Sequence, residues 1–204
     1  MIPPDLSFEE KLWQQGVKHI VGIDEVGRGS WAGPLVSAGV ILSKDFEIPK
    51  GFAESKQISP TKRAQFAKFI TQKALAIKIV EVSHARIDKI GIGKATQASF
   101  RSVIRNIKIT PDYFLVDAFY VNYFPKNKQL AIKKGDEKSA SIAAASIIAK
   151  IYRDKLMSQL SKKFPNYGFE KHKGYGTKVH QQMIKAYGFA PIHRTSFNLS
   201  YLVS

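Results

Sequence analysis

The chain contains no cysteine among its 204 residues, which excludes disulfides and any metal or iron–sulfur site built on cysteine. It also lacks a long hydrophobic run: the longest strongly apolar stretch, residues 142–149, is too short to span a bilayer. The first residues, MIPPDLSFEEKLW, carry acids where a secretory signal carries bases. We therefore expect a cytoplasmic protein with no export signal and no membrane partner.

Acidic residues are scarce: Asp and Glu number 16 against 32 Lys and Arg, which gives a net charge of +16. Such a surplus favours a polyanionic partner, because each phosphate that a protein neutralises releases condensed counterions. The bases are spread along the chain, and no long basic amphipathic helix suggests an anionic membrane surface instead. Nucleic acid is therefore the leading class of partner.

Hydrophobic patterns and turn residues predict strands at residues 18–25, 34–42, 75–82, 113–117 and 130–133. Helices are expected at 7–16, 59–74, just after Ser83, 93–106, 138–164 and 177–187. Ser7 and Glu10 have the spacing of a capping box, and Ser59 precedes Pro60 as an N-cap. This order predicts an α/β domain with a mixed central sheet flanked by helices. We expect one domain over 1–204, with a sheet-and-helix core at about 18–160 and a helical C-terminal segment at about 161–204.

Acidic residues stand at the ends of two predicted strands and before the long helix. Asp24 and Glu25 end the first strand, Asp117 ends the strand YFLVD, and Asp136 precedes the helix at 138–164. Functional groups of α/β folds gather where strand ends meet loops. Carboxylates suit Mg²⁺ or Mn²⁺, and two such ions about 3.5–4 Å apart can stabilise both the attacking and the leaving oxygen of a phosphodiester. Any one of these acids alone would be an ordinary turn or ion-pair residue, but together they favour a metal-dependent enzyme.

A glycine-rich segment, Gly27-Arg28-Gly29, follows the first two acids. It superficially matches a dinucleotide-binding fingerprint, but it leads into Pro34 and another strand where that fingerprint needs a helix. Its glycines allow close backbone approach to a ligand, and contact with a 2′-hydroxyl is what separates RNA from DNA. A tight turn with no ligand is the alternative on spacing alone.

Six segments resemble bacterial ribonuclease HII in order and spacing, and the resemblance as a whole runs from about residue 8 to residue 200. They are GIDEVGRGSWAGPLVSAGVIL (22–42), ESKQISPTKR (54–63), LVDA (115–118), KKGDEKSASIAAASIIAKIYRD (133–154), HKGYGTKVH (172–180) and PIHRTSF (191–197). The related ribonuclease HIII has a larger N-terminal extension and another residue where Arg28 stands, so type HII is favoured. Ser30-Trp31 and Ala118 depart from the residues that are common in the family, and both flank the acids without replacing them.

The resemblance implies an RNase H-like fold and a Mg²⁺- or Mn²⁺-dependent endonuclease, with two ions in the substrate complex. Its reactions would be cleavage of RNA in RNA–DNA hybrids and cleavage 5′ of ribonucleotides in duplex DNA, leaving 5′-phosphate and 3′-hydroxyl ends. Nothing in the sequence indicates an obligate protein partner or demands more than a monomer. The implied catalytic, metal-binding residues are Asp24, Glu25, Asp117 and Asp136. The implied substrate-binding residues are Gly27, Arg28 and Gly29, which read the 2′-hydroxyl, Tyr175, which stacks on the deoxyribose at the junction, and Lys56 near the backbone path.

Several alternatives stay open at this point. Asp154 is the rival fourth ligand, but it lies about 27 Å beyond Asp136 along a continuous helix, so both cannot serve one site. His172 and His180 are expected to be polar surface or phosphate-near groups. The run at 143–145 is expected in the core. The aromatic residues Tyr120, Tyr123 and Phe124 could stack on bases, but they are expected to cover the core. A non-catalytic basic RNA-binding module is the alternative function, and a nuclease indifferent to the 2′-hydroxyl is another.

Overall fold

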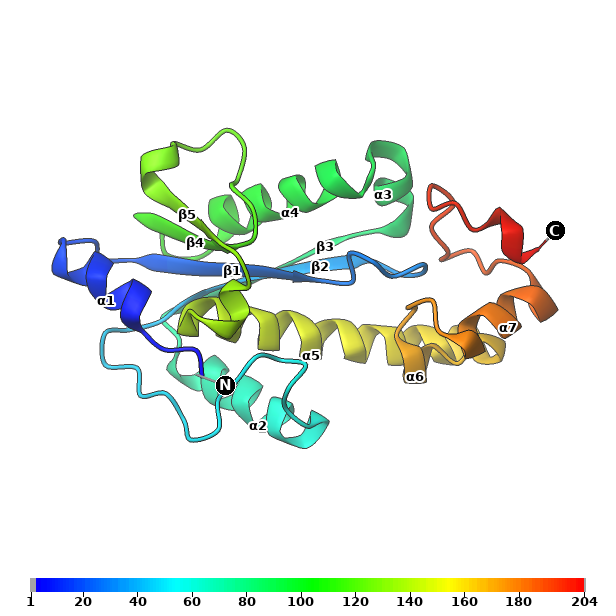
Figure 1. Cartoon of the computed structure of the whole chain (residues 1–204), viewed down its shortest axis with the longest axis horizontal. Helices are drawn as coiled ribbons and strands as arrows, with labels where there is room; N and C mark the ends of the chain where they lie inside the picture. The colour runs from blue at the N-terminus through cyan, green and yellow to red at the C-terminus, as the bar shows by residue number, and fades with distance from the viewer. Residues whose placement is uncertain (1–2, 204) are drawn as a thin grey trace.

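The computed structural model describes residues 3–203, in which one five-stranded sheet lies between two layers of helices (Figure 1). The strand order is β3-β2-β1-β4-β5; β2 is antiparallel to β1 and to β3, whereas β1, β4 and β5 run parallel. The strands are β1 (Ile20–Val26), β2 (Leu35–Ile41), β3 (Ala76–Val82), β4 (Tyr113–Asp117) and β5 (Gln129–Ile132). The predicted mixed α/β sheet is confirmed.

Helices cover both faces of this sheet. The helices are α1 (Ser7–Gln14), α2 (Pro60–Lys73), α3 (His84–Ile90), α4 (Ile92–Asn106), α5 (Ala140–Lys163), α6 (Phe169–His172) and α7 (Lys178–Tyr187). Helices α3 and α4 lie on one face and α5 and α2 on the other, while α6 and α7 form a helical C-terminal segment at one end (Figure 1). The short α6 has no counterpart among the predicted helices. None of the helices within residues 3–203 has the length and apolar character to cross a membrane.

The helix starts follow the local sequence in most cases. Ser59 caps α2, where its hydroxyl accepts the backbone N–H of Lys62 at 3.3 Å. The predicted capping box at Ser7 is wrong, because Ser7 is already inside α1. Its backbone N–H donates instead to Asp5 Oδ1 at 3.0 Å. Asp5 is itself tied to the start of α5 by two backbone hydrogen bonds, which set where α1 begins.

Alternation along β1 decides which side chains meet α5. Val21 and Ile23 pack in the cluster beneath α4, so Gly22 and Asp24 face the opposite layer. A Cβ at Gly22 would lie 2.2 Å from the backbone carbon of Ser141, so α5 rests directly on the strand. The expected core run at 143–145 is fully buried there. This close packing sets the first turns of α5 beside the end of β1.

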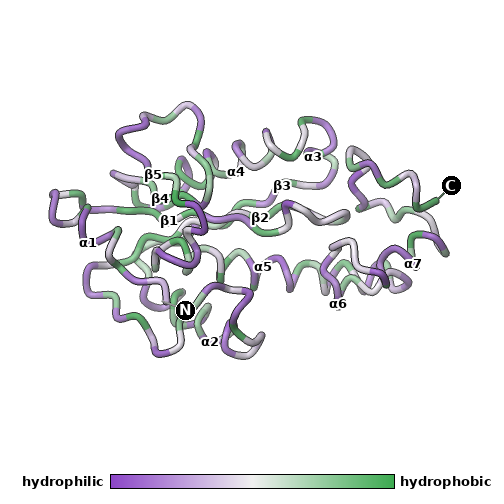
Figure 2. Tube along the Cα trace, in the orientation of Figure 1, coloured by the Kyte–Doolittle hydropathy of each residue, from purple (hydrophilic) through white to green (hydrophobic). Residues whose placement is uncertain are grey.

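Apolar residues concentrate along the sheet and its facing helices, and polar residues along the outer loops (Figure 2). A separate cluster joins the C-terminal segment to the far end of α5. Its buried members are Ala32, Met157, Tyr167, Phe169, Ala190 and Ile192. Because Ala32 belongs to the glycine-rich region, this cluster ties the C-terminal segment to the loop after β1.

Gly22→Ala should therefore destabilise the fold by about 2 kcal/mol, since an added methyl must push α5 away from β1. The matched control is Gly93→Ala in α4, where a Cβ would meet no atom within 4 Å. Urea unfolding should show the loss for Gly22→Ala only. Equal unfolding free energies for the two variants would show that α5 does not rest on β1 in this way.

Candidate active site

One pocket of 420 Å³ opens at the end of β1 and contains every residue that the sequence predicts for the site. It is lined by Asp24, Glu25, Val26, Gly27, Arg28, Gly29, Ser55, Lys56, Asp117, Asp136, Ser146, Lys150 and Tyr175. A larger pocket of 860 Å³ lies between the N-terminal segment and residues 48–57, but it holds none of the predicted site residues. The smaller pocket is therefore the candidate active site, because it is the one where the predicted acids, cations and glycine-rich loop converge.

Strand pairing brings Asp24 and Asp117 together. Strands β1 and β4 are parallel neighbours, and these two acids come directly after their last paired residues, Ile23 and Val116. Each acid is separated by two positions from a residue that faces α5, so both carboxylates lie on the α5 side of the sheet. Glu25, next in β1, has one carboxylate oxygen, Oε2, that is buried without a hydrogen-bond partner.

A backbone hydrogen bond brings Asp136 beside Asp117. Asp136 lies in a single 3-10 turn, Gly135–Glu137, that precedes α5. The N–H of Gly135 donates to Asp117 Oδ1 at 2.7 Å. Asp136 thus stands before the helix rather than in it, because Ser139 is the N-cap residue of α5. The turn holds the fourth carboxylate at the carboxyl ends of the two parallel strands.

Burial raises the pKa of all four carboxyl groups, and repulsion by the other carboxylates of the cluster adds to it in Asp24, Glu25 and Asp136. Burial, together with the charges of Glu25 and Asp117, raises the pKa of Asp24 well above its usual range. Burial and the charge of Asp117 raise the pKa of Glu25 to about 7 and that of Asp136 to about 6. Burial also raises the pKa of Asp117, although the N–H of Gly135 works in the opposite direction. Bringing these groups together costs free energy that a cation between them would recover.

The chemistry of this donor set fits a hard divalent cation. All the candidate ligands are carboxylate oxygens, and the unpaired buried Oε2 of Glu25 lacks any protein donor. Within residues 3–203 no three acidic or histidine side chains already form a close ligating group, so the carboxylates must draw together to hold an ion. Cation binding would also have to displace protons from the groups with raised pKa values.

Glu25→Gln should stabilise the metal-free protein increasingly as the pH rises from 5 to 8. The raised pKa of Glu25 means that the folded state holds a proton that the unfolded state releases between about pH 4.5 and 7, so stability is lost across that window. The variant should exceed the wild type by about 2 kcal/mol at pH 8 and by little at pH 5. Chemical denaturation in EDTA measures this difference. The exposed Glu47→Gln is the control, and a pH-independent difference for Glu25→Gln would contradict the repulsion.

The glycine-rich loop, residues 27–34, presents one face to the pocket and rests its other face on buried side chains. Gly27 has φ +90°, and a Cβ there would lie 2.1 Å from Arg153 Nε, so only glycine fits. Gly29 would meet no atom within 4 Å, which leaves its face open to a ligand. The guanidinium of Arg28 lies 4.5 Å over the ring of Phe119. Buried side chains therefore support one face of the loop, and its other face is accessible from the pocket.

Tyr175 and Lys56 reach the same pocket from distant segments. Tyr175 follows α6, is 37% exposed, and has its ring 5.6 Å from the guanidinium of Arg153. Lys56 lies before α2, with Nζ 3.2 Å from Glu54 Oε1. Burial works to lower the pKa of Lys56, but the hydrogen bond and charge of Glu54 raise it. The structure thus places an aromatic ring and two cations, Arg28 and Lys56, around the acids.

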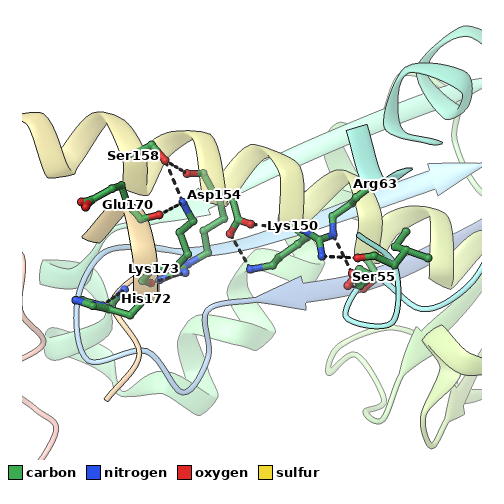
Figure 3. Close-up of polar contacts among 12 residues, drawn as sticks. Ser55, Arg63, Lys150, Asp154, Ser158, Glu170, His172 and Lys173 are labelled. Atoms are coloured by element: carbon green, nitrogen blue, oxygen red, sulfur yellow. Dashed lines mark hydrogen bonds and ion pairs between the residues drawn. The ribbon is translucent and has the colours of Figure 1, made fainter. Parts of the chain in front are cut away.

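Asp154 lies outside the pocket. Its carboxylate contacts Lys150 Nζ at 2.7 Å and Arg63 at 3.8 Å, which joins α5 to α2 (Figure 3). Asp154 is therefore an ion-pair residue between two helices and not a rival ligand. Asp136, by contrast, faces the other acids, so the structure favours it as the fourth member of the cluster.

The prediction that His180 is a surface or phosphate-near group is wrong, whereas His172 is half-buried. His180 is fully buried and stacks on the ring of His172 with centroids 4.4 Å apart. Its Nε2 lies 2.9 Å from His193 Nε2, and burial lowers its pKa to about 4, so it is neutral. The three histidine rings pack in the aromatic core around Phe169. The basic residues that neighbour them in the sequence made a surface position the expectation.

The aromatic residues after Asp117 divide into two kinds. Phe124 packs on Phe114 with ring centroids 5.2 Å apart, as a core cover should. For Tyr120 and Tyr123 the expectation is wrong, since they are 47% and 87% exposed. Tyr123 also has a positive φ of 70°, in the left-handed region that is typical of turns.

Sequence reasoning missed three polar residues of the pocket: Ser55, Ser146 and Lys150. Ser146 and Lys150 are four apart on α5, so helical spacing could have found them once one was suspected. The hydroxyl of Ser146 works to lower the pKa of Asp24. Two buried arginines beneath the loop, Arg153 and Arg194, were also missed, because nothing in the sequence marks an arginine as buried.

Comparisons with known proteins agree on one family. The model of the family Ribonuclease HII matches residues 21–200. A ribonuclease HII of Bacillus cereus (strain AH820) is 48% identical over 191 residues, which cover 94% of this chain and 73% of the relative. One of Bacillus licheniformis is 45% identical over 94% and 74%. Ribonuclease H2 from Pyrococcus horikoshii OT3 superposes with a TM-score of 0.73 at 25% identity, over 88% of this chain and 94% of that one.

Two further solved structures share the fold. The chain superposes on a structure of the PCNA:RNase HII complex from Archaeoglobus fulgidus with a TM-score of 0.74 at 27% identity, over 89% of this chain and 96% of that one. A Bst-RNase HIII in complex with Mn²⁺ gives a TM-score of 0.61 at 19% identity, over 86% and 65%, which shows the fold alone.

Proposed function

Since the chain belongs to the ribonuclease HII family of metal-dependent ribonucleases H, which act on RNA–DNA hybrids, we propose that it also cuts duplex DNA on the 5′ side of embedded ribonucleotides. The cut leaves 5′-phosphate and 3′-hydroxyl ends. The observation that carries this proposal is the convergence of four carboxylates and the glycine-rich loop on one pocket. The carboxylates supply the chemistry, and the loop beside them supplies the choice of sugar.

Asp24, Glu25, Asp117 and Asp136 are the residues that would hold the divalent ions. Two Mg²⁺ or Mn²⁺ ions supply charge that stabilises both the attacking and the leaving oxygen of a phosphodiester. Each carboxylate has a fixed origin on β1, on β4 or in the turn bound to Asp117. Their raised pKa values support this role, because a dication favours the ionised form of each group.

The loop and its neighbours bind and orient the nucleic acid. Gly29, where an added methyl would meet no atom within 4 Å, lets the backbone approach the ribose, where its amides can reach the 2′-hydroxyl. Arg28 and Lys56 flank the carboxylates and neutralise backbone phosphates. The ring of Tyr175, which lines the same pocket, stacks on the deoxyribose next to the ribonucleotide. The surplus of positive charge elsewhere holds the duplex without regard to sequence.

The test is cleavage of labelled duplex DNA that carries one ribonucleotide, beside an all-DNA duplex, with Mg²⁺, with Mn²⁺ and with EDTA. We expect a single cut 5′ of the ribonucleotide with either ion, no cut in EDTA and no cut in the all-DNA duplex. Ligation with and without phosphatase identifies the ends. Cleavage of both duplexes would indicate a nuclease indifferent to the sugar, and salt-sensitive binding with no cut would indicate the binding module.

A further inference from the structure

Two arginines beneath the glycine-rich loop are completely buried. Arg153, from α5, and Arg194, from the segment after α7, each have 0% relative exposure and are among the largest fully buried side chains of the described residues. Arginine is almost never fully buried unless its charge is compensated. Burial lowers the pKa of Arg194 to about 9, so the group remains charged at neutral pH. The contacts that each guanidinium makes must therefore explain why the fold buries it.

Arg194 donates only to carbonyls of the loop. Its Nε and Nη2 both donate to Gly33 O, at 3.0 and 2.9 Å, and its Nη1 donates to Arg28 O at 3.0 Å. Its backbone joins the same region, since its N–H donates to Trp31 O at 2.8 Å. The Arg194 side chain therefore hydrogen-bonds to both ends of the loop, on either side of Gly29.

Arg153 joins the loop to the turn that carries Tyr175. Its Nε donates to Pro34 O at 2.9 Å and its Nη2 to Ala32 O at 3.2 Å. Its Nη1 donates to Lys173 O at 2.9 Å, two residues before Tyr175. The guanidinium also lies 5.6 Å from the ring of Tyr175 and within 3 Å of where a side chain at Gly27 would begin.

Neither guanidinium takes part in the ion pairs found within residues 3–203. Backbone carbonyls thus compensate both charges, and the five carbonyls concerned point toward the buried guanidinium groups. They belong to Arg28, Ala32, Gly33, Pro34 and Lys173. Two positive charges with no carboxylate at ion-pair distance also lie directly behind the surface that faces the proposed phosphate backbone, and Asp154 and Asp88 act on them only from further away. An anion at that surface is attracted by both, because low-dielectric surroundings screen them weakly.

We propose that Arg153 and Arg194 are positioning residues for sugar recognition, which fix the glycine-rich loop and Tyr175 in one arrangement and attract the phosphate backbone from behind it. This inference rests on the proposed function, since it assigns these arginines to the same recognition step. They touch neither the carboxylates nor the substrate. Their effect passes through the loop, so substitution should change the choice of sugar without changing metal binding.

Arg194→Lys tests the proposal, because lysine keeps the charge but cannot span Gly33 O and Arg28 O with a planar fork. We expect kcat/KM on the single-ribonucleotide duplex to fall at least about 10-fold. In an Asp117→Asn background, where binding can be measured without cleavage, the preference for that duplex over all-DNA duplex should fall by a similar factor. Mn²⁺ binding to the protein with Asp117 intact, followed by calorimetry, should stay within about 2-fold of the wild type.

Phe100→Leu is the control for lost stability alone, since Phe100 is a fully buried residue of α4, on the opposite face of the sheet from α5. At an assay temperature well below the melting temperatures of the wild type and of Phe100→Leu, this variant should keep the wild-type kcat/KM. It should also keep the wild-type preference for the single-ribonucleotide duplex over the all-DNA duplex. Arg153→Lys is the second variant, and should reproduce the loss of preference if Arg194→Lys folds poorly. A wild-type preference in the folded arginine variants would overturn the inference, whereas a wild type without cleavage would overturn the proposed function itself.

Discussion

Asp117→Asn should lower the rate of hybrid cleavage about 10³-fold or more while leaving affinity for the hybrid within about 3-fold. The substitution removes one charge from the cluster but keeps a side-chain oxygen at this position. In the wild type the N–H of Gly135 donates to Asp117 Oδ1 at 2.7 Å, and the amide oxygen of asparagine can accept the same bond. The turn carrying Asp136 should therefore stay in place. Loss of the charge alone removes a ligand and weakens the neutralisation of the ions. Single-turnover cleavage and equilibrium binding, measured on the same hybrid, separate the two effects.

Asp112→Asn is the matched control, because Asp112 stands just before the opposite end of the same strand. Its carboxylate accepts the backbone N–H groups of Lys18 and His19 at 3.3 and 2.9 Å, and it does not line the pocket. It should leave the cleavage rate within about 2-fold of the wild type. Equal turnover for Asp117→Asn and the wild type would remove Asp117 from the proposed metal ligands.

Tyr175→Ala should reduce kcat/KM about 10²-fold on a duplex with one ribonucleotide and about 10-fold on a long hybrid. A lone ribonucleotide offers a single productive register, so loss of the stacking ring cannot be offset by binding elsewhere along the strand. A long hybrid offers many registers. Stacking on an aromatic ring is worth about 1–3 kcal/mol in single-stranded nucleic-acid complexes, which sets the scale of the loss.

Tyr175→Phe keeps the ring and should retain most of the activity on both substrates. Tyr187→Ala, which removes a 56% exposed tyrosine from the end of α7, controls for loss of an aromatic surface residue. The values of kcat/KM on the single-ribonucleotide duplex and on the long hybrid should be measured at the same salt concentration, because the strength of phosphate contacts depends on salt. An equal loss on the two substrates would leave Tyr175 in the site but contradict its role at the junction.

The position of the acids could largely be predicted from the sequence, for a physical reason. Strand ends are marked by local patterns, and a carboxylate near the end of an apolar strand lies where the strands meet the loops. What the sequence could not show is that β4 lies beside β1, since a register between residues that are far apart in the chain depends on the whole fold. Nor could it show that Gly135 binds Asp117 and thereby places Asp136.

Burial of polar groups escaped prediction. The sequence around His180 is basic, and only the fold reveals that Phe169 and His193 enclose its ring. Arg153 and Arg194 look like ordinary members of a basic surface, yet both are fully buried. Their partners are backbone carbonyls, which every residue carries, so no side-chain pattern identifies the contact.

The most direct test of the site is the anomalous diffraction of Mn²⁺ in crystals of the protein with an uncleavable hybrid. We predict Mn²⁺ peaks within about 2–2.5 Å of carboxylate oxygens from Asp24, Glu25, Asp117 and Asp136, beside the glycine-rich loop. Peaks that lie elsewhere, with these four carboxylates uncoordinated, would contradict the proposed active site.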